Sequence, residues 1–490
     1  MSREFIIPKE VALVSETLEK GGFEAYLVGG CVRDLIVKRL PKDWDITTNA
    51  TPDDIQQLFP HTFYENQYGT VGVVNEATDD ETLKVVEVTP YRVEGTYSDA
   101  RRPDSVSFSD NLTDDLKRRD FTINAIAYSI SQGQLVDPYN GQKDIDGKRI
   151  AAVGNPDDRF KEDALRMLRA VRLAAELGFA IETETASAIS LHSAQLERIS
   201  TERIRDEFTR IILSDQPMIG IVLSQKLGLL KYIAPDLERG IGIKQNQAHS
   251  YEVFEHNLRT LQHAADKGWP LDVRLAALFH DVSKPEARRW SDEKKDWTFH
   301  GHEVVGARVA NKILTELLFS KEIVEKAVKL VRWHMFFSDP EQVTLAAVRR
   351  TIKNVGQENI WDLLNLRICD RIGTGRPKEQ PFRFRKYKSM VEEAFRDPTS
   401  VTMLAIDGAS IMKQTDERPG PRIGWMLHAL LEEVLDDPAK NSQAYLTSRV
   451  HEFSKLPDAE LLELGEAGKK RREQYEAEAV KTIRDKYWVS

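Results

Sequence analysis

The sequence has 490 residues, of which 41% are hydrophobic and 30% charged, with a formal net charge of −9. This length allows about two to four domains, and the composition is that of a globular rather than a disordered chain. The net charge argues against nonspecific coating of nucleic acid, which depends on neutralising many phosphates. No apolar run reaches signal-peptide or membrane-spanning length, so we expect a cytoplasmic protein without membrane contacts.

The pattern of apolar residues changes near residue 157. From residue 26 to 139, short β-branched runs alternate with helical stretches, whereas long helical periodicities follow, as in 161–177 and 201–212. We therefore predict an α+β fold, with a small α/β head followed by an all-helical remainder. The predicted domains are a head, a helical neck, a larger helical body and a C-terminal helical region with a solvated tail helix, at residues 1–150, 151–225, 226–400 and 401–490.

The first candidate site follows a Gly-Gly turn at Gly29 and Gly30. Asp43 and Asp45 are expected on one strand and, because side chains alternate along a strand, on the same face of it. Two adjacent carboxylates favour a cation between them, and Mg²⁺ suits oxygen ligands and phosphate partners. The glycines let backbone N–H groups approach a triphosphate, with Arg33 as its charged partner. On its own, a D-x-D pattern is more often a solvated strand face.

The combination of GGCVRD with KDWDITT resembles the signature of the DNA polymerase beta superfamily, in its class II tRNA nucleotidyltransferase and bacterial poly(A) polymerase branch. This resemblance extends over roughly residues 20 to 440. It implies a polymerase-beta-like head that performs metal-dependent nucleotidyl transfer at Asp43 and Asp45. It also implies that the C-terminal helical region, residues 401–490, binds RNA. Glu87 is a candidate third carboxylate.

A second pattern places Asp163, Arg166, Arg169 and Arg172 at every third residue of one predicted helix. Such a stripe is often solvated, but three arginines on one edge also suit contacts with phosphates or a base. Cytosine and adenine both present an amine beside a ring-nitrogen acceptor. A carboxylate and a guanidinium can therefore accept C and A together, while G and U present the opposite polarity.

The stripe also resembles the EDxxRxxRxxR motif of the class II family, which follows RRDFTINA here. The resemblance implies base selection by Asp163 with Arg166, and nucleotide or triphosphate contacts by Arg169 and Arg172. It also implies nucleotide binding by Arg119, and ribose selection by residues 118–124.

Two further stretches bear on the reaction within this family. Residues 93–108 resemble the flexible loop that full CCA-adding enzymes use when they switch from C to A. Residues 64–74 lack the basic, histidine-containing signature usual in bacterial poly(A) polymerases. Both observations favour CCA addition over polyadenylation.

Histidines are concentrated between residues 249 and 334, which hold seven of the eleven. The order of His256, His280-Asp281 and Asp370 resembles the HD phosphohydrolase superfamily, whose imidazoles and carboxylates bind a divalent metal. This implies a second divalent metal, of unknown identity, and phosphatase, 2′-nucleotidase or cyclic phosphodiesterase activity. His302 and His334 are candidate accessory ligands or phosphate contacts. The alternative is a retained fold with little turnover.

Together these features predict an enzyme that adds CCA to the 3′ end of tRNA with CTP and ATP as substrates. A bacterial poly(A) polymerase and a non-catalytic RNA-binding protein are the alternatives. The sequence does not indicate the oligomeric state.

Overall fold

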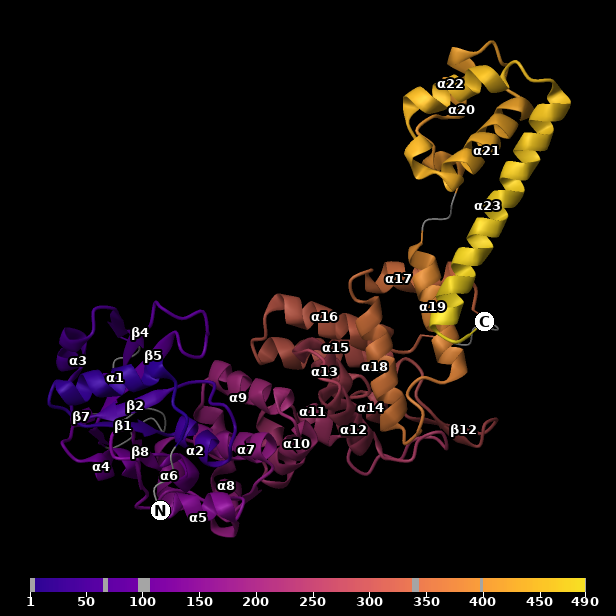
Figure 1. The fold of residues 1–490 in the computed structure, drawn as a ribbon. Helices are drawn as coiled ribbons and strands as arrows, with labels where there is room; N and C mark the ends of the chain where they lie inside the picture. Colours follow the sequence, from indigo (N-terminus) through magenta and orange to yellow (C-terminus); the bar gives the residue numbers. More distant parts are fainter. Residues whose placement is uncertain (1–4, 65–68, 96–105, 337–342, 397–399, 490) are drawn as a thin grey trace. The chain divides into compact units, whose positions relative to one another are not determined.

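The computed structural model describes residues 5–64, 69–95, 106–336, 343–396 and 400–489. It divides into two compact units: residues 1–334 with 365–377, and residues 335–364 with 378–490 (Figure 1). Among the described helices, none is both long and apolar enough to span a membrane.

The first unit opens with a seven-stranded sheet in the order β3-β4-β5-β2-β1-β8-β9. Among the described strands of this sheet, only β2 and β5 pair in parallel, and their register aligns Asp45 with Glu87. Val, Ile and Thr dominate the central strands, as expected for a buried sheet. The strands are β1 (Ala25–Val28), β2 (Asp45–Thr48), β3 (Thr62–Tyr64), β4 (Val71–Val74), β5 (Val85–Pro90), β8 (Ala127–Ser129) and β9 (Gln134–Val136).

Short helices pack on this sheet and fix its loops. Thr51 and Asp54 form a reciprocal capping box at the start of α3, so the chain turns immediately after β2. The helices of this region are α1 (Lys9–Lys20), α2 (Gly30–Ile36), α3 (Pro52–Leu58), α4 (Leu112–Lys117), η1 (Thr122–Asn124) and α5 (Gly141–Asp146).

The stretch expected to be a mobile loop has paired ends. Strands β6 (Arg92–Glu94) and β7 (Val106–Phe108) form a two-stranded antiparallel sheet. Residues 96–105 lie outside the described residues.

Helices α7, α9 and α10 pack against one another beside the head, and α6 packs on α8. Gly178 ends α7 with a φ of 69°, which glycine adopts without strain. A two-residue parallel pair joins β10 (Arg149–Ile150) to β11 (Ala180–Ile181). The helices are α6 (Pro156–Glu162), α7 (Leu165–Leu177), α8 (Thr183–His192), η2 (Ser193–Arg198), α9 (Thr201–Leu213) and α10 (Pro217–Lys226).

A helical layer completes the first unit, but it contains a hairpin that the helical pattern did not predict. Strands β12 (Arg289–Ser291) and β13 (Asp296–Thr298) pair through Trp290 and Trp297, whose ring centroids lie 5.2 Å apart. Such aromatic pairs across strands stabilise short hairpins. The helices are η3 (Leu230–Tyr232), α11 (Pro235–Glu238), α12 (Val253–Asp266), α13 (Leu271–Phe279), α14 (Lys284–Ala287), α15 (His302–Glu316), α16 (Lys321–Trp333) and part of α18 (Ile360–Gly373).

The second unit has its own apolar core, which includes Met426, Leu430 and Leu446. The expected tail helix forms, but it is not solvated along its whole length, since Gly465 and Gly468 let it pack closely on α21. The helices are α17 (Leu345–Val355), α19 (Phe382–Phe395), η4 (Val401–Met403), α20 (Gly408–Gln414), α21 (Pro421–Asp436), η5 (Pro438–Lys440), α22 (Gln443–Phe453) and α23 (Asp458–Lys486).

Candidate active site and metal centre

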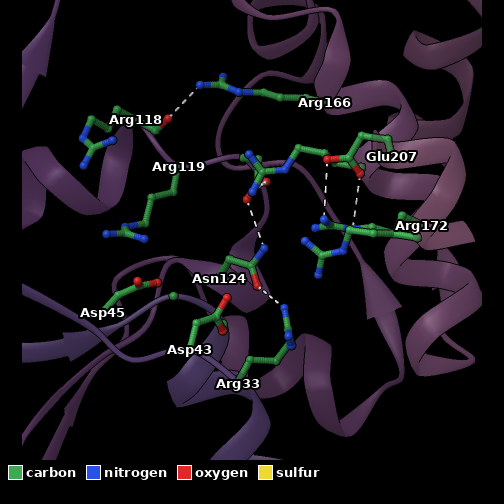
Figure 2. Close-up of a pocket in the computed structure, with 14 residues that line it drawn as sticks. Arg33, Asp43, Asp45, Arg118, Arg119, Asn124, Arg166, Arg172 and Glu207 are labelled. Atoms are coloured by element: carbon green, nitrogen blue, oxygen red, sulfur yellow. Dashed lines mark hydrogen bonds and ion pairs between the residues drawn. The ribbon is translucent and has the colours of Figure 1, made fainter. Parts of the chain in front are cut away.

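Asp43 and Asp45 lie on one wall of a cavity in the first unit (Figure 2). The strand expected to carry both begins only at Asp45, and Asp43 lies in the bend before it. The ladder with β5 reaches back no further than Trp44, whose carbonyl accepts the Glu87 N–H at 3.0 Å. Asp43 is therefore held by the bend, not by strand pairing.

Two neighbours shape this carboxylate pair. Glu87 stands beside Asp45 in the parallel register, so both side chains leave the same face of the sheet. Gly29 has a φ of 81°, and a Cβ there would lie 3.4 Å from Asp45 Oδ2 and 3.0 Å from Arg119 Nη1. A side chain at Gly29 would therefore crowd the space between these groups.

The cavity has a volume of about 430 Å³ and a strongly cationic lining. Half of its lining residues are arginines, which suits a polyanionic ligand such as a triphosphate. It is lined by Gly29, Gly30, Arg33, Asp43, Asp45, Arg118, Arg119, Asp120, Asn124, Arg166, Arg169, Arg172, Glu207 and Arg210. The predicted catalytic and nucleotide-binding residues are among them, except Asp163 and the candidate third carboxylate Glu87.

Asp115 holds two of these arginines from beneath. Its buried carboxylate contacts Arg118 Nη2 at 2.5 Å and Arg119 Nη2 at 3.0 Å. Burial alone would raise the pKa of Asp115, but the charges of Arg119 and Arg118 outweigh it and hold the pKa below its usual value. Asp115 therefore stays ionised and fixes both guanidinium groups.

Two more buried carboxylates hold the arginines of α7. Asp120 Oδ2 lies 2.9 Å from Arg169 Nη2, and Glu207 Oε2 lies 3.3 Å from Arg172 Nε. Burial favours the neutral form of Asp120, but Arg169 and a hydrogen bond from Asn124 lower its pKa. Burial raises the pKa of Glu207, with the nearby arginines opposing it.

Asn124 links the two walls of the cavity. It accepts a hydrogen bond from Arg33 Nη1 at 2.7 Å and donates one to Asp120 Oδ1 at 3.1 Å (Figure 2). Arg33, on α2, is thereby connected through Asn124 and Asp120 to Arg169 on α7.

The sequence pattern predicted Asp163 on the same helix as Arg166, Arg169 and Arg172. This prediction was wrong, because Asp163 lies between α6 and α7. It ends α6 with φ −140° and ψ 105°, and its Oδ1 accepts the Leu165 N–H at 3.0 Å. The Asp163 carboxylate thus takes a backbone N–H that could otherwise form a helical hydrogen bond, and the helix is interrupted between α6 and α7. Arg203 Nη2 donates to Asp163 Oδ2 at 2.7 Å.

Arg166, by contrast, lines the cavity and is nearly buried. Its Nη2 donates to the Arg118 carbonyl at 3.0 Å, and its Nη1 donates to Glu162 Oε2 at 2.6 Å. These bonds fix the guanidinium between the head and neck.

Several residues that support this cavity were not predicted. Asp115 lies three and four residues before Arg118 and Arg119, which is the spacing of ion pairs one helical turn apart. These two ion pairs could therefore have been predicted from the sequence. Three charged residues on α9 also follow one another at the spacing of a helical turn, so the sequence could have placed them on one face of that helix. It could not have shown which groups they contact. These residues are Arg203, Glu207 and Arg210.

A second cluster, far from this cavity in sequence, brings together the predicted HD residues. His256 Nε2 lies 3.0 Å from His280 Nε2, 3.1 Å from Asp281 Oδ2 and 3.4 Å from Asp370 Oδ1. All four side chains are buried. They form groups whose ligand atoms could hold a metal ion. His302 and His334 approach the other oxygen of Asp281.

The charges of this cluster favour a cation. Burial would raise the pKa of Asp281, but neighbouring His280 and Lys284 hold it well below its usual value. Burial would lower the pKa of His256, yet Asp281 and Asp370 raise it to about 9. The carboxylates thus stay ionised in a site where an uncompensated charge is costly.

Replacing Asp115 by Asn should lower the free energy of unfolding by about 3 kcal/mol at pH 7, because two arginines lose a buried partner. The folded-state pKa of Asp115 lies below the ordinary value of 3.8. Its contribution is therefore complete above that pH and is lost as the pH falls through the folded-state pKa. Urea unfolding followed by circular dichroism at pH 7 and pH 3 should show a smaller variant effect at the lower pH.

Asp110 is an exposed carboxylate before the same helix, so Asp110→Asn is the control and should change little. A loss in Asp115→Asn no larger than in this control would contradict the bridging role.

Comparisons with known proteins agree with this geometry. Sequence models of three families match the chain: the "Poly A polymerase head domain" at 25–151, the "Probable RNA and SrmB- binding site of polymerase A" at 178–241, and the "HD domain" at 253–372. The CCA-adding enzyme of Limosilactobacillus reuteri is 31% identical over 90% of this chain and 96% of its own length. That of Geobacillus kaustophilus is 43% identical over 59% of this chain and 74% of its own length.

A solved structure gives the same result. The crystal structure of the Bacillus stearothermophilus CCA-adding enzyme in complex with CTP is 26% identical, with a TM-score of 0.59 over 91% of this chain and 98% of its own. Both the α+β fold class and the resemblance seen in the motifs are confirmed. The chain belongs to the family of the CCA-adding enzymes, the nucleotidyltransferases that complete the 3′ end of tRNA.

Proposed function

We propose that this chain adds CCA to the 3′ end of tRNA with CTP and ATP, without a nucleic-acid template. One observation carries the proposal: the carboxylates Asp43 and Asp45 line the same cavity as Arg166, which lies 121 residues or more further along the chain. A catalytic group and a base-reading group therefore share one space. The names of the relatives support the same reaction.

Asp43 and Asp45 would hold Mg²⁺, since their oxygens are the hard ligands that this ion prefers and arginines on the facing wall can take the phosphates. Bound there, the metal supplies a lower pKa for the attacking 3′-hydroxyl and neutralises charge on the leaving pyrophosphate. Glu87, beside Asp45 in the sheet, is the proposed third carboxylate.

The arginines would bind the triphosphate while remaining paired with their carboxylates. Arg119 contacts Asp115 through Nε and Nη2, and its Nη1 faces the position of a Gly29 Cβ, near Asp45. One guanidinium has five N–H donors in a fixed fork, so it can serve a carboxylate and a phosphate together. We assign Gly30, Arg33, Arg169 and Arg172 to the same ligand.

Asp163 and Arg166 would read the edge of the base. Arg166 uses three of its five donors on Glu162 and on two backbone carbonyls, so donors remain for a ring nitrogen. Asp163 would accept the exocyclic amine of C or A. Arg203 positions that carboxylate: it holds Oδ2 at 2.7 Å and Oδ1 at 3.3 Å.

Base selection requires the Asp163 carboxylate to remain open to a nucleotide while Arg203 holds it. Each carboxylate oxygen has two lone pairs, so Oδ2 can accept a second hydrogen bond beside that of Arg203. Arg203 would then fix the angle of the carboxylate toward the base.

The alternatives within and outside this family are less well supported. The relatives that match most of the chain are CCA-adding enzymes, so a bacterial poly(A) polymerase is not favoured. A non-catalytic RNA-binding protein would not need the adjacent carboxylates of Asp43 and Asp45 in a cavity lined by seven arginines.

The HD cluster would add a metal-dependent phosphohydrolase activity, with phosphate esters at RNA ends as the substrate class. The second unit would contact the tRNA. The domain limits at residues 150, 225 and 400 remain predictions from the sequence. Cytoplasmic location is likewise a prediction.

A tRNA transcript that lacks its three terminal nucleotides tests the function directly. With CTP alone the full chain should add both cytidines and stop, and ATP should then add a single adenosine, as read on a gel at single-nucleotide resolution. UTP and GTP should add nothing. Asp45→Asn should slow addition by at least about 10³-fold because metal binding is lost.

The exposed carboxylate Asp79 provides the control, and Asp79→Asn should retain activity. Long tails of adenosine from ATP alone would identify a poly(A) polymerase. Absence of any addition by the parent chain would identify a non-catalytic protein.

Arg203→Met tests how the base is selected. The ratio of kcat/KM for CTP to that for UTP should fall about tenfold, because an unclamped Asp163 no longer penalises the uracil carbonyl as strongly. Arg205→Met, on the same helix but bonded to Asp206, should leave the ratio unchanged. An unchanged ratio in Arg203→Met, with a lower unfolding temperature, would show that Arg203 serves only stability.

A further inference from the structure

The catalytic face of the head sheet continues past the carboxylates to an aromatic ring. In the parallel register Asp45 on β2 pairs with Glu87 on β5. In the two antiparallel pairs that follow, Glu87 aligns with Gly72 on β4, and Gly72 aligns with Phe63 on β3. Residues paired in this way leave the sheet on the same face. Phe63 therefore stands in one row with the carboxylates, beyond the proposed third carboxylate.

Gly72 gives the Phe63 ring its place in this row. A Cβ at Gly72 would lie 2.5 Å from Phe63 Cζ and 2.7 Å from Cε1, so the ring occupies the space of the missing side chain. Since neighbouring strands are about 4.8 Å apart, the ring lies roughly one strand spacing from Glu87. Phe63 nevertheless remains 43% exposed. The ring thus presents an apolar surface to solvent beside the catalytic carboxylates.

The cavity that would bind the triphosphate lies toward the other side of Asp45. Its glycines follow β1, Arg118 and Arg119 precede β8, and none of its described lining residues belongs to β3, β4 or β5. In the sheet, β1 and β8 lie on one side of β2, whereas β5, β4 and β3 lie on the other. Attacking and leaving oxygens are roughly in line in phosphoryl transfer. A pyrophosphate that leaves toward the arginines therefore requires the 3′-hydroxyl to attack from the β5 side.

We propose that the 3′-terminal base of the RNA stacks on the Phe63 ring, which holds the terminal ribose beside Asp45 and Glu87. This inference rests on the proposed nucleotidyl transfer and assigns the RNA side of that site. Stacking uses the π face that every base has, and a phenylalanine ring has no hydrogen-bonding group with which to prefer one base. Successive addition requires this tolerance, because the terminal base changes with each nucleotide added.

A thermodynamic cycle between residue 63 and the terminal base tests the proposal. The full chain is titrated, without nucleoside triphosphate, with an RNA minihelix that ends at the nucleotide preceding CCA, and filter binding gives the Kd. The same RNA with an abasic terminal nucleotide should bind about tenfold more weakly to the parent chain. Phe63→Leu should bind the intact RNA about tenfold more weakly and the abasic RNA no more weakly still, because both changes remove one contact.

Tyr64 provides the matched control on the same strand. It is 52% exposed, but its side chain leaves the opposite face of the sheet, and its hydroxyl donates to Asp53 Oδ1 at 3.3 Å. Tyr64→Leu should therefore keep the tenfold difference between the two RNAs. Unfolding temperatures of both variants check that each is folded.

Two results would overturn the proposal. The parent chain could bind both RNAs equally, or Phe63→Leu could still distinguish them tenfold, in which case the ring only covers Gly72. The cycle measures binding alone, so either result leaves nucleotide addition by the parent chain intact. Failure of the proposed function would appear separately, as absence of that addition.

Discussion

Arginine side chains gathered around one cavity repel one another, and this repulsion is the constraint on which the first site depends. Three buried carboxylates relieve it: Asp120 and Glu207 lie in the cavity lining, and Asp115 lies outside it. Each pairs with one or two arginines through part of the guanidinium fork, and the remaining donors can face a ligand. The cavity is thus cationic before any nucleotide arrives, and little reorganisation is needed on binding.

The same contacts tie the catalytic sheet to the helices that would select the base. Arg166 on α7 donates to the Arg118 carbonyl, and Arg169 pairs with Asp120, so the two walls share a fixed geometry. In the HD cluster the buried charges that need compensation are negative, not positive. There the buried carboxylates of Asp281 and Asp370 gather histidines, and the arrangement calls for a cation.

Motif residues with a strict chemical role were predictable from the sequence, whereas their supports were not. Asp43, Asp45 and Arg166 line the cavity as expected, although Asp43 lies in the bend before β2 and not on the strand itself. The pairing of Asp163 with Arg203 depends on how two helices cross, which a linear pattern does not encode. The α+β class followed from apolar periodicity, but the β12–β13 hairpin is too short to give a periodic signal.

The central claim is that one cavity both binds the triphosphate and distinguishes the base before tRNA is present. Calorimetric titration of the full chain with each of the four nucleoside triphosphates, in Mg²⁺ and without tRNA, tests it most directly. CTP and ATP should bind at least about tenfold more tightly than GTP and UTP, and Arg166→Ala should remove the difference. Equal binding of all four, or a preference that survives in Arg166→Ala, would contradict the account.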